Sequence, residues 1–444
     1  MRIAVIGTGF AGLVAGVSFA ELDHEVIYAD TDLEKIKRLA RGEIQIYEPG
    51  LRELILRNAE AGRLSFTSNI TEATRLSEVV ILAPDSSPLS KGEPNFAELA
   101  AAAREVAYSM NNRKTIITKC SVPPGTNERL KRLMAELTDQ SFAIVSVPAF
   151  LREGTAIKDA FNPDRIVIGS DDSTAAQTAA ELHRPLSDKM VITDLRTAEI
   201  MNYVANAFLA TKKAFMQEMA SLCAKVGADA EKVALGVGYD HRIGHSFLAE
   251  GIGDNGFGFL KDAETLIQLA CSVEHEVKLL ESVVAINRVQ RFAIIHKLEE
   301  LLGDLRGLNI AVWGAAIRPN TNEVRDSQAI PIIRELVKKG ATVKISDPLA
   351  LPNLRKLVDA DSIIWCVDGL EAACDADAIC LLTEWEEYGR YQMKHLRRVM
   401  KQPVLVDARS MFREEQLLDS GFIYSSIGSH SMNTSLSPVK RPIA

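Results

Sequence analysis

The feature that most constrains this chain is a glycine-rich turn close to its N-terminus. A short apolar run at 2–6 leads into Gly7-Thr8-Gly9-Phe10-Ala11-Gly12, and a helical pattern follows to about Leu22. A second strand-like run at 25–29 ends at Asp30, 18 residues after Gly12. This order of strand, turn, helix and acid predicts a dinucleotide-binding unit, because Gly7 permits the turn, Gly9 admits a pyrophosphate and Gly12 allows close packing. Asp30 would accept bonds from both ribose hydroxyls and repel a 2′-phosphate, which favours NAD over NADP; the alternative is a glycine turn with a purely structural role.

Strand-like and helical runs alternate on both sides of a helical segment, and this alternation predicts the fold class. Strands are expected at 78–82, 115–118, 142–146 and 165–168, and again at 309–313, 342–346, 378–382 and 404–406. Between Thr197 and Val226, apolar residues recur at spacings of three and four, which predicts one long helix. We therefore expect an α/β protein with two Rossmann-like doubly wound domains joined by a long central helix and a helical middle domain. The expected boundaries are 1–196, 197–302 and 303–430, followed by a flexible tail at 431–444.

Composition excludes several other classes of protein. The formal net charge is −8, so no general surface for nucleic acid is indicated. The six cysteines show no CxxC spacing, so neither a metal site nor a redox motif is expected, and sparse thiols fit a cytoplasmic protein. No uninterrupted apolar run is long enough to cross a membrane, and the glycines of the apolar N-terminus fit a strand-turn-helix better than a signal peptide.

Several separate motifs give the chain a specific resemblance over about 430 residues. They are IGTGFAGLVAG (6–16), GEIQIYEPGL (42–51), FLREGTA (150–156), PDRIVIG (163–169), YVANAFLATK (203–212), GYDHRIG (238–244), IRPNTNEVRDS (317–327) and VDARSMF (406–412). With these motifs the chain resembles the UDP-glucose/GDP-mannose dehydrogenase family, most closely the bacterial UDP-glucose 6-dehydrogenases. The resemblance implies NAD on the N-terminal domain, a UDP-sugar between the domains, a homodimer built on the long helix, and a role in polysaccharide biosynthesis. Family members oxidise the sugar C6 alcohol to a carboxylate in two hydride transfers, through a thioester on a cysteine.

The resemblance also assigns residues position by position. For the cofactor it implies Gly7, Gly9, Phe10, Ala11, Gly12, Asp30, Lys35, Ser86, Ser121, Glu153, Lys261 and Arg325. For the UDP-sugar it implies Phe150, Leu151, Arg152, Asn202, Asn206, Arg242, Phe247, Leu248, Gly251, Gly258, Arg318 and Arg409, with Arg242 reaching the site of the partner subunit. The expected catalytic set is Ser121, Glu153, Asn206 and Asp262, of which Ser121 and Asp262 are the candidates to hold a catalytic water; a structural salt bridge with Lys261 is the alternative for Asp262.

Three departures from the family pattern remove reactive groups, and all three bear on one reaction. The nucleophilic cysteine of GGSCFPKD corresponds to Gly258, one glutamate of PEFLRE to Ala149, and the catalytic lysine to Asn202. Without a thiolate the second hydride transfer loses its usual route. Without the lysine a developing alkoxide loses its cationic partner, and without the glutamate thioester hydrolysis loses its base.

The machinery could instead have moved to other residues. Cys120 precedes Ser121, but neighbouring residues of an extended chain point to opposite sides, so a thiol there is expected to face away from the site. Cys271 is expected in a helix core, and His241 and His245, which stand where the family usually has prolines, are expected at a surface or interface rather than as bases.

Three functions therefore remain open. The first is an NAD-dependent oxidoreductase of a UDP-sugar that performs less than the four-electron oxidation, either as a single oxidation or as a redox-neutral epimerase with bound NAD. The second is an ordinary UDP-glucose 6-dehydrogenase with substituted residues. The third is a protein that binds NAD and a UDP-sugar without turnover.

Overall fold

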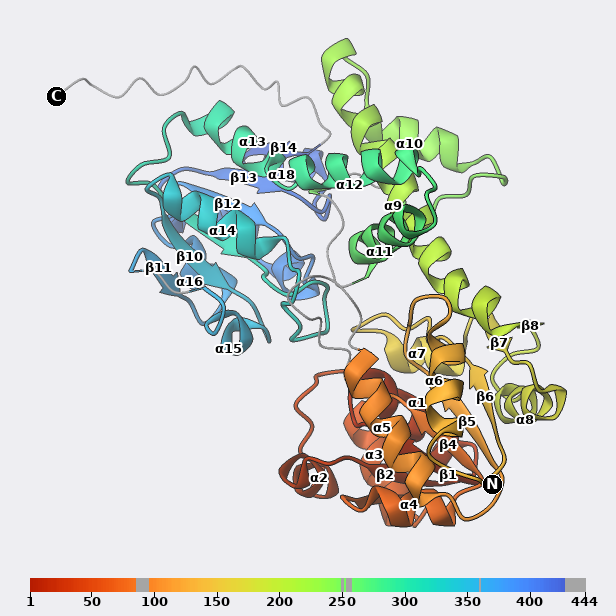
Figure 1. The fold of residues 1–444 in the computed structure, drawn as a ribbon. Helices are drawn as coiled ribbons and strands as arrows, with labels where there is room; N and C mark the ends of the chain where they lie inside the picture. Colours follow the sequence, from red (N-terminus) through yellow and green to blue (C-terminus); the bar gives the residue numbers. More distant parts are fainter. Residues whose placement is uncertain (85–95, 249–250, 253–257, 359–360, 428–444) are drawn as a thin grey trace. The chain divides into compact units, whose positions relative to one another are not determined.

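The computed structural model describes residues 1–84, 96–248, 251–252, 258–358 and 361–427 (Figure 1). The chain forms two compact units, Met1–Ala205 and Asn206–Ala444, which are described separately. Ser86 and the tail expected at 431–444 lie outside the described residues. Nowhere in the described ranges is a helix both long enough and apolar enough to cross a bilayer.

The N-terminal unit is built around one sheet with the strand order β3-β2-β1-β4-β5-β6-β7-β8. Its strands are β1 (Arg2–Ile6), β2 (Glu25–Ala29), β3 (Leu64–Thr67), β4 (Val79–Leu82), β5 (Lys114–Thr118), β6 (Phe142–Ser146), β7 (Ile166–Gly169) and β8 (Met190–Thr193). Its helices are α1 (Phe10–Glu21), α2 (Leu33–Ala40), α3 (Leu51–Glu60), α4 (Ile70–Leu76), α5 (Phe96–Ser109), α6 (Thr126–Ala135), α7 (Ala156–Phe161) and α8 (Ser173–His183). The pairs from β1 to β6 are parallel, as expected, but β7 runs antiparallel to β6 and pairs with it at a single position, Ser146 with Gly169. Such a change of direction toward the end of a mostly parallel sheet is common.

Both faces of this sheet are covered, and alternate residues of one strand serve the two faces. Ile3 and Val5 of β1 pack in a buried cluster with residues of α1, α3 and α8. Ala4 and Ile6 pack in a second cluster with residues of α4, α5 and α6. Because both faces are buried, the central strands read as continuous apolar runs rather than as alternating ones.

The second unit combines a helical segment with a six-stranded parallel sheet of order β11-β10-β9-β12-β13-β14. The strands are β9 (Asn309–Trp313), β10 (Thr342–Ser346), β11 (Ile363–Trp365), β12 (Ala378–Leu381), β13 (Val404–Asp407) and β14 (Ile423–Ser426). Around this sheet lie α14 (Ala329–Lys338), α15 (Leu351–Leu354), α16 (Gly369–Ala373), the 3-10 helix η1 (Glu386–Arg390), α17 (Met393–Val399) and α18 (Glu414–Asp419). The helical segment holds α10 (Ala230–Gly238), α11 (Phe259–Ser272), α12 (Lys278–Gln290) and α13 (Ala293–Leu302). The long helix predicted from Thr197 to Val226 is α9 (Leu195–Val226), which begins in the first unit and ends in the second.

Asp347, at the end of β10, fixes the loops of the second sheet. One carboxylate oxygen accepts the amides of Ala315 and Ala316 and the indole N–H of Trp385, at 2.7, 2.9 and 3.1 Å. The other oxygen accepts the amides of residues 349 and 350 at 2.9 and 2.7 Å. The side chain is buried, at 4% exposure, and its removal would leave these donors without a partner.

We predict that Asp347→Ala destabilises the second unit by at least about 3 kcal/mol, because each buried unsatisfied donor costs about 1–3 kcal/mol. All three tryptophans (Trp313, Trp365 and Trp385) belong to this unit, so tryptophan fluorescence during urea unfolding reports on it selectively. Glu386→Ala is the control, because its exposed ion pair with Arg390 contributes little. Equal midpoints for the two variants would contradict the assignment.

Candidate functional site

The glycine turn predicted at the start of the chain lies between β1 and α1. Gly7 has φ +99°, and a Cβ on it would lie 2.4 Å from the carbonyl oxygen of Ala83. A Cβ on Gly12 would lie 2.2 Å from the carbonyl oxygen of Gly7, so both positions require glycine. Gly9 caps α1, and as a glycine it offers no side chain to bond the first amides of that helix. The N-terminus of α1 is therefore available for the phosphates of a ligand that approaches past Phe10 and Ala11.

Asp30 lies at the end of β2, beside this turn. One of its oxygens accepts the amide and the hydroxyl of Thr8, at 3.0 and 2.6 Å, and Lys35 lies 3.5 Å away. Burial acts to raise the pKa of Asp30, but the hydrogen bonds from Thr8 and Asp32 and the charge of Lys35 outweigh it, so the pKa lies below its ordinary value. The carboxylate is therefore ionised and can accept bonds from ribose hydroxyls, and the turn, the helix terminus and Asp30 together fit a dinucleotide.

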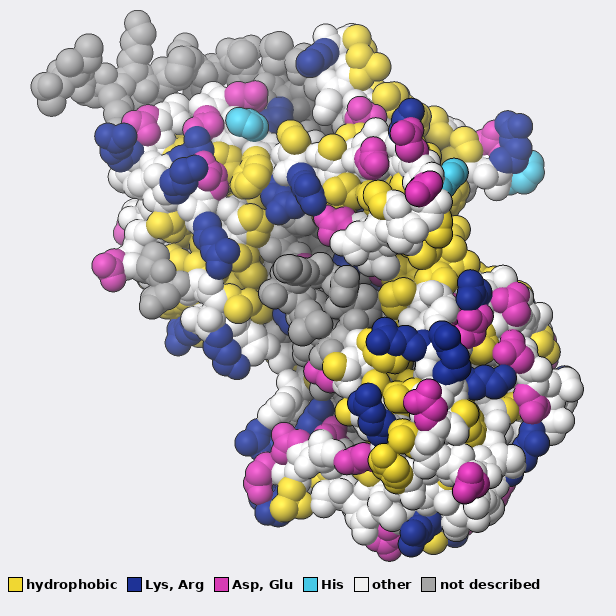
Figure 2. All heavy atoms as spheres, in the orientation of Figure 1, with side chains coloured by type: hydrophobic (Ala, Val, Ile, Leu, Met, Phe, Trp, Pro, Cys, Tyr) yellow, Lys and Arg dark blue, Asp and Glu magenta, His cyan; other side chains and the backbone are white. Residues whose placement is uncertain are grey.

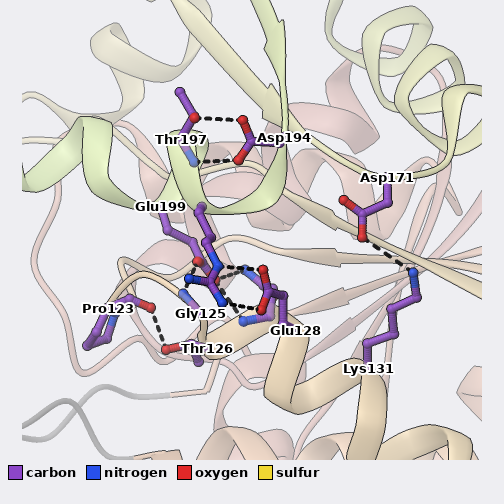
Figure 3. A network of polar contacts seen from close by, with 11 residues as sticks. Pro123, Gly125, Thr126, Glu128, Lys131, Asp171, Asp194, Thr197 and Glu199 are labelled. Atoms are coloured by element: carbon purple, nitrogen blue, oxygen red, sulfur yellow. Dashed lines mark hydrogen bonds and ion pairs between the residues drawn. The ribbon is translucent and has the colours of Figure 1, made fainter.

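Helix α9 holds the loop that carries Ser121. Asn202 donates its side-chain N–H to the Ser121 hydroxyl oxygen at 2.8 Å. One turn earlier, Glu199 accepts the amides of Gly125 and Asn127 at 2.6 and 2.7 Å and the side-chain N–H of Asn127 at 2.9 Å (Figure 3).

The contacts between α9 and this loop have a buried part, formed by Glu199, and an exposed part, formed by Arg196. Burial raises the pKa of Glu199, which is only 1% exposed, although its hydrogen bonds act against the rise. Arg196 adds a two-bond ion pair with Glu128 at 2.6 and 2.7 Å, nearer the surface. Residues 196, 199 and 202 are three apart, so one stripe of α9 makes all these contacts.

A second pair of candidates meets in the other unit. Asn206 donates to Asp262 at 2.6 Å, and Asp262, in the first turn of α11, is buried. Burial lowers the pKa of Lys261, while Asp262 and Asp326 act in the opposite direction. Asp262 thus accepts a hydrogen bond from the Asn206 amide and lies near the Lys261 cation. These contacts are compatible with a structural salt bridge and with a role in the site.

The loop with Glu153 is held by a residue that sequence reasoning missed. Glu48 is buried and accepts the amides of Gly154 and Ala156 at 2.7 Å each, at the start of α7. Burial raises the pKa of Glu48, although these amide bonds act against the rise. The only sequence signal was its place within the motif at 42–51, since a tertiary contact over a hundred residues leaves no local pattern.

The sugar-nucleotide candidates of the first unit are already engaged within the chain. Arg152 forms an ion pair with Asp159 at 2.5 Å, and the guanidinium of Arg165 lies 3.8 Å from the ring centre of Phe150. Leu151 lines the same cavity as Phe150.

The candidates of the second unit make separate local contacts. Phe247 has φ +65°, which is strained for an aromatic residue. Its ring packs edge-on against the ring of Phe259, with the ring centres 5.7 Å apart. Leu248 is buried, and a Cβ on Gly251 would lie 2.9 Å from the carbonyl oxygen of Ala408.

The arginine candidates differ in their partners. Arg409 donates to the carbonyl oxygen of Leu382 at 2.7 Å, and Arg318 is half-buried. Arg325 forms an ion pair with Glu323, and the exposed Arg242 forms one with Asp240.

The structure also shows the surroundings of Gly258, which replaces the family cysteine, and of the cysteines and histidines considered as substitutes. Gly258 has φ +150°, a conformation that residues with side chains rarely adopt. Cys120 packs against the cluster formed with α4, α5 and α6, and burial raises the pKa of its thiol to about 12. Cys271, expected in a helix core, is exposed instead, because it lies on the outer side of α11 near the helix end. His241 and His245 are exposed, and in the described part of the chain no group of His, Cys, Asp or Glu could hold a metal.

The two sheets differ in the aspartate that follows the second strand of each, Asp30 after β2 and Asp347 after β10. Asp30 keeps surface for a ligand, whereas both oxygens of Asp347 are occupied by protein donors. Asp347 therefore has no capacity left for a ribose, so only the first sheet combines the glycine turn with an available acid.

Comparison with known proteins agrees with this geometry. Residues 1–187 match the NAD binding domain of the UDP-glucose/GDP-mannose dehydrogenase family, residues 196–289 its central domain and residues 311–414 its UDP binding domain. The chain is 42% identical over 430 residues to the UDP-glucose 6-dehydrogenase TuaD of Bacillus subtilis, covering 96% of this chain and 93% of that protein. It is 41% identical over 437 residues to the UDP-glucose 6-dehydrogenase of Rhizobium meliloti, covering 96% and 99%.

Solved structures show the same likeness over the whole fold. A UDP-glucose dehydrogenase from Pyrobaculum islandicum aligns with a TM-score of 0.89 at 32% identity, covering 96% of this chain and 97% of that one. A UDP-D-ManNAc dehydrogenase from Pyrococcus horikoshii aligns with a TM-score of 0.84 at 26% identity, covering 97% and 100%. The chain therefore belongs to the UDP-glucose/GDP-mannose dehydrogenase family, and its cofactor is NAD, bound by the N-terminal domain.

Proposed function

We propose that this protein is an NAD-dependent oxidoreductase of a UDP-sugar that does not complete the four-electron oxidation. The observation that carries the proposal is Gly258, which stands where the resemblance places the nucleophilic cysteine. A glycine offers no atom that could form a thiohemiacetal with an aldehyde, so the chain has no thioester route at this position. The reaction is then either a single oxidation or a redox-neutral epimerisation in which the same NAD takes and returns a hydride.

Three of the cysteines, Cys120, Cys366 and Cys380, give little support to a relocated nucleophile. The thiolate is the reactive form, and a pKa of about 12 keeps Cys120 protonated at neutral pH. Cys366 and Cys380 are buried in the second sheet region, where burial raises the pKa of both thiols.

The retained polar residues are suited to hold and polarise a hydroxyl group. When bound, NAD accepts a hydride from the substrate carbon. Because Asn202 donates to the oxygen of Ser121, the hydroxyl proton of Ser121 can be donated to a substrate oxygen or a water. Asp262 is oriented by Asn206 and can accept a proton, and Glu153 on the loop held by Glu48 is the second candidate base.

A second candidate function has a specific observation in its favour. Relatives named UDP-glucose 6-dehydrogenase share up to 42% identity with almost the full chain. An ordinary UDP-glucose 6-dehydrogenase would need a different nucleophile or direct oxidation of an aldehyde hydrate.

The stoichiometry of NADH distinguishes these functions. We expect incubation with NAD and a panel of UDP-hexoses to convert a sugar with one NADH or no net NADH per molecule, with products identified by mass spectrometry and NMR. Two NADH per UDP-glucose with formation of a uronate would replace this proposal with the second candidate. Binding without any change in sugar or coenzyme would contradict both and leave a non-catalytic binding protein.

We also propose that the protein is a homodimer that pairs through α9. Val204, Phe208, Phe215 and Leu222 recur at spacings of four and seven and are 51 to 64% exposed, which is unusual for four large apolar side chains on one helix. Figure 2 shows hydrophobic side chains at the surface along this helix. In such a dimer the exposed Arg242 would be placed to reach the site of the partner subunit, as the resemblance implies.

We predict that Phe208→Asp with Phe215→Asp converts the dimer to a monomer, because two carboxylates would be buried without partners. Light scattering coupled to size-exclusion chromatography measures the mass. Tyr108→Asp, at an exposed aromatic residue of α5, is the matched control and should leave the mass unchanged. An unaltered mass for the double variant would rule out this face as the interface.

We predict that Asp30→Ala weakens NAD binding by about 10- to 100-fold, since hydrogen bonds to a charged group contribute about 1.5–3 kcal/mol. Isothermal titration calorimetry with NAD provides the dissociation constant. Asp32→Asn is the control, because an asparagine keeps the cap of α2 that Asp32 provides. A dissociation constant unaffected by Asp30→Ala would place the coenzyme elsewhere.

We predict that Gly258→Cys alone does not create a two-NADH enzyme. Its backbone at φ +150° disfavours any side chain, and Asn202 still lacks the positive charge of the family lysine. Hydroxylamine trapping after incubation with substrate and NAD reports on an acyl-thioester. An adduct at position 258 would show that the sulfur was the only missing component.

A further inference from the structure

A cavity of about 60 Å³ lies within the N-terminal unit, bordered by α1, by the loop after β6 and by α8. By the same measure a single water needs only about 10–15 Å³, so the cavity has room for a small polyatomic molecule. Its walls are mostly apolar, and Ala149 forms part of them. The charged and titratable side chains that line it are Lys119, Asp159, Arg165 and His183.

Lys119 lines this cavity and has no acidic partner within the described residues. The ring centre of Phe19 lies 5.9 Å from its Nζ, and in the described ranges no carboxylate forms an ion pair with it. Asp159 lines the same cavity, but it is engaged by Arg152 through three hydrogen bonds, one from the amide and two from the guanidinium. Burial lowers the pKa of Lys119 to about 8, so the amine is mostly charged at neutral pH and its charge is uncompensated.

His183 also lines this cavity and carries a buried acceptor. Its Nδ1 lies 2.7 Å from the carbonyl oxygen of Ala179, and because a carbonyl only accepts, Nδ1 carries the proton. Nε2 is then unprotonated and acts as an acceptor. It has no hydrogen-bond partner within the described part of the chain, although the residue is only 2% exposed. Burial and the nearby charge of Lys119 hold the pKa of His183 well below its ordinary value, so the ring stays neutral.

A ligand that satisfies both groups needs an anionic oxygen for Lys119 and an O–H for His183. Arg165 strengthens the preference for an anion, since its guanidinium is fixed over the ring of Phe150 at the cavity wall. We propose that this cavity binds a small oxoacid monoanion that keeps one proton, with bicarbonate as the simplest member of the class. The cavity shares Ala11, Phe150 and Leu151 with the candidate cofactor and sugar residues, but its polar groups Lys119 and His183 belong to neither set.

Bicarbonate and nitrate form a matched pair of probes, because both are small planar monoanions and only bicarbonate carries an O–H. We expect bicarbonate to raise the melting temperature of the full-length protein saturably, at constant ionic strength with chloride, and to do so at lower concentration than nitrate. Binding of ¹³C-bicarbonate, followed by NMR line broadening, gives the dissociation constant directly.

Three variants and one control assign the response to this cavity. Lys119→Met should weaken bicarbonate binding at least tenfold, whereas Lys131→Met, which removes an exposed lysine, should leave it unchanged. His183→Phe keeps an aromatic ring against Phe19, where the ring centres are now 5.1 Å apart, and should abolish the preference for bicarbonate over nitrate. Ala149→Leu should block both anions by filling the cavity.

The pH dependence provides an independent readout. Because the anion needs the charged amine, its affinity should fall as the pH rises through about 8, the pKa of Lys119.

Three results would overturn the proposal. The first is a bicarbonate response that persists in Lys119→Met, since the anion would then be bound elsewhere, for example at the N-terminus of α1, where NAD would compete with it. The second is equal affinity for nitrate, which would exclude a role for the proton and for His183. The third is the absence of any response in the wild-type protein, which would leave the cavity with water only.

Discussion

Carboxylates that accept backbone amides, most of them buried, hold the loops on which the rest of this molecule depends. Loops between strands and helices carry the functional groups of doubly wound domains, and their amides must find partners when they are buried. Here Asp30 holds the turn before α1, Glu48 the start of α7, Glu199 the start of α6, and Asp407 the segment after β13. Each carboxylate has two oxygens and no competing donor, so it can satisfy several amides at once, which a neutral side chain cannot do equally well.

The sequence could predict the interior of both sheets but not their edges. The central strands are buried on both faces, so they appear as uninterrupted apolar runs. The four strands that the sequence did not reveal, β3, β8, β11 and β14, are the outermost strands of their sheets. Three of them (β3, β8 and β11) are largely half-buried or exposed, so their apolar pattern is weak and short, and pairing with the sheet rather than local sequence defines them as strands.

The same distinction applies to the site. The glycine turn and Asp30 could be predicted because steric need and spacing are local properties of a chain. Glu48 and Glu199 could not, because each acts on a loop that is distant in sequence, and a carboxylate in a helical pattern usually indicates a solvent-facing position. For the face of α9 that contains Glu199 and Asn202, the helical periodicity can be predicted from the sequence. The residues that these two side chains contact are known only from the structure.

The backbone at Gly258 has a consequence for how this branch of the family can evolve. Two of the four glycine codons become a cysteine codon by one base change, so the genetic distance to a thiol is short. The peptide geometry makes the structural distance much longer, because φ +150° is accessible to glycine and strongly disfavoured for any residue with a β-carbon. A cysteine at this position would therefore require the neighbouring chain to rearrange, so a single substitution would not by itself place a thiol in the site.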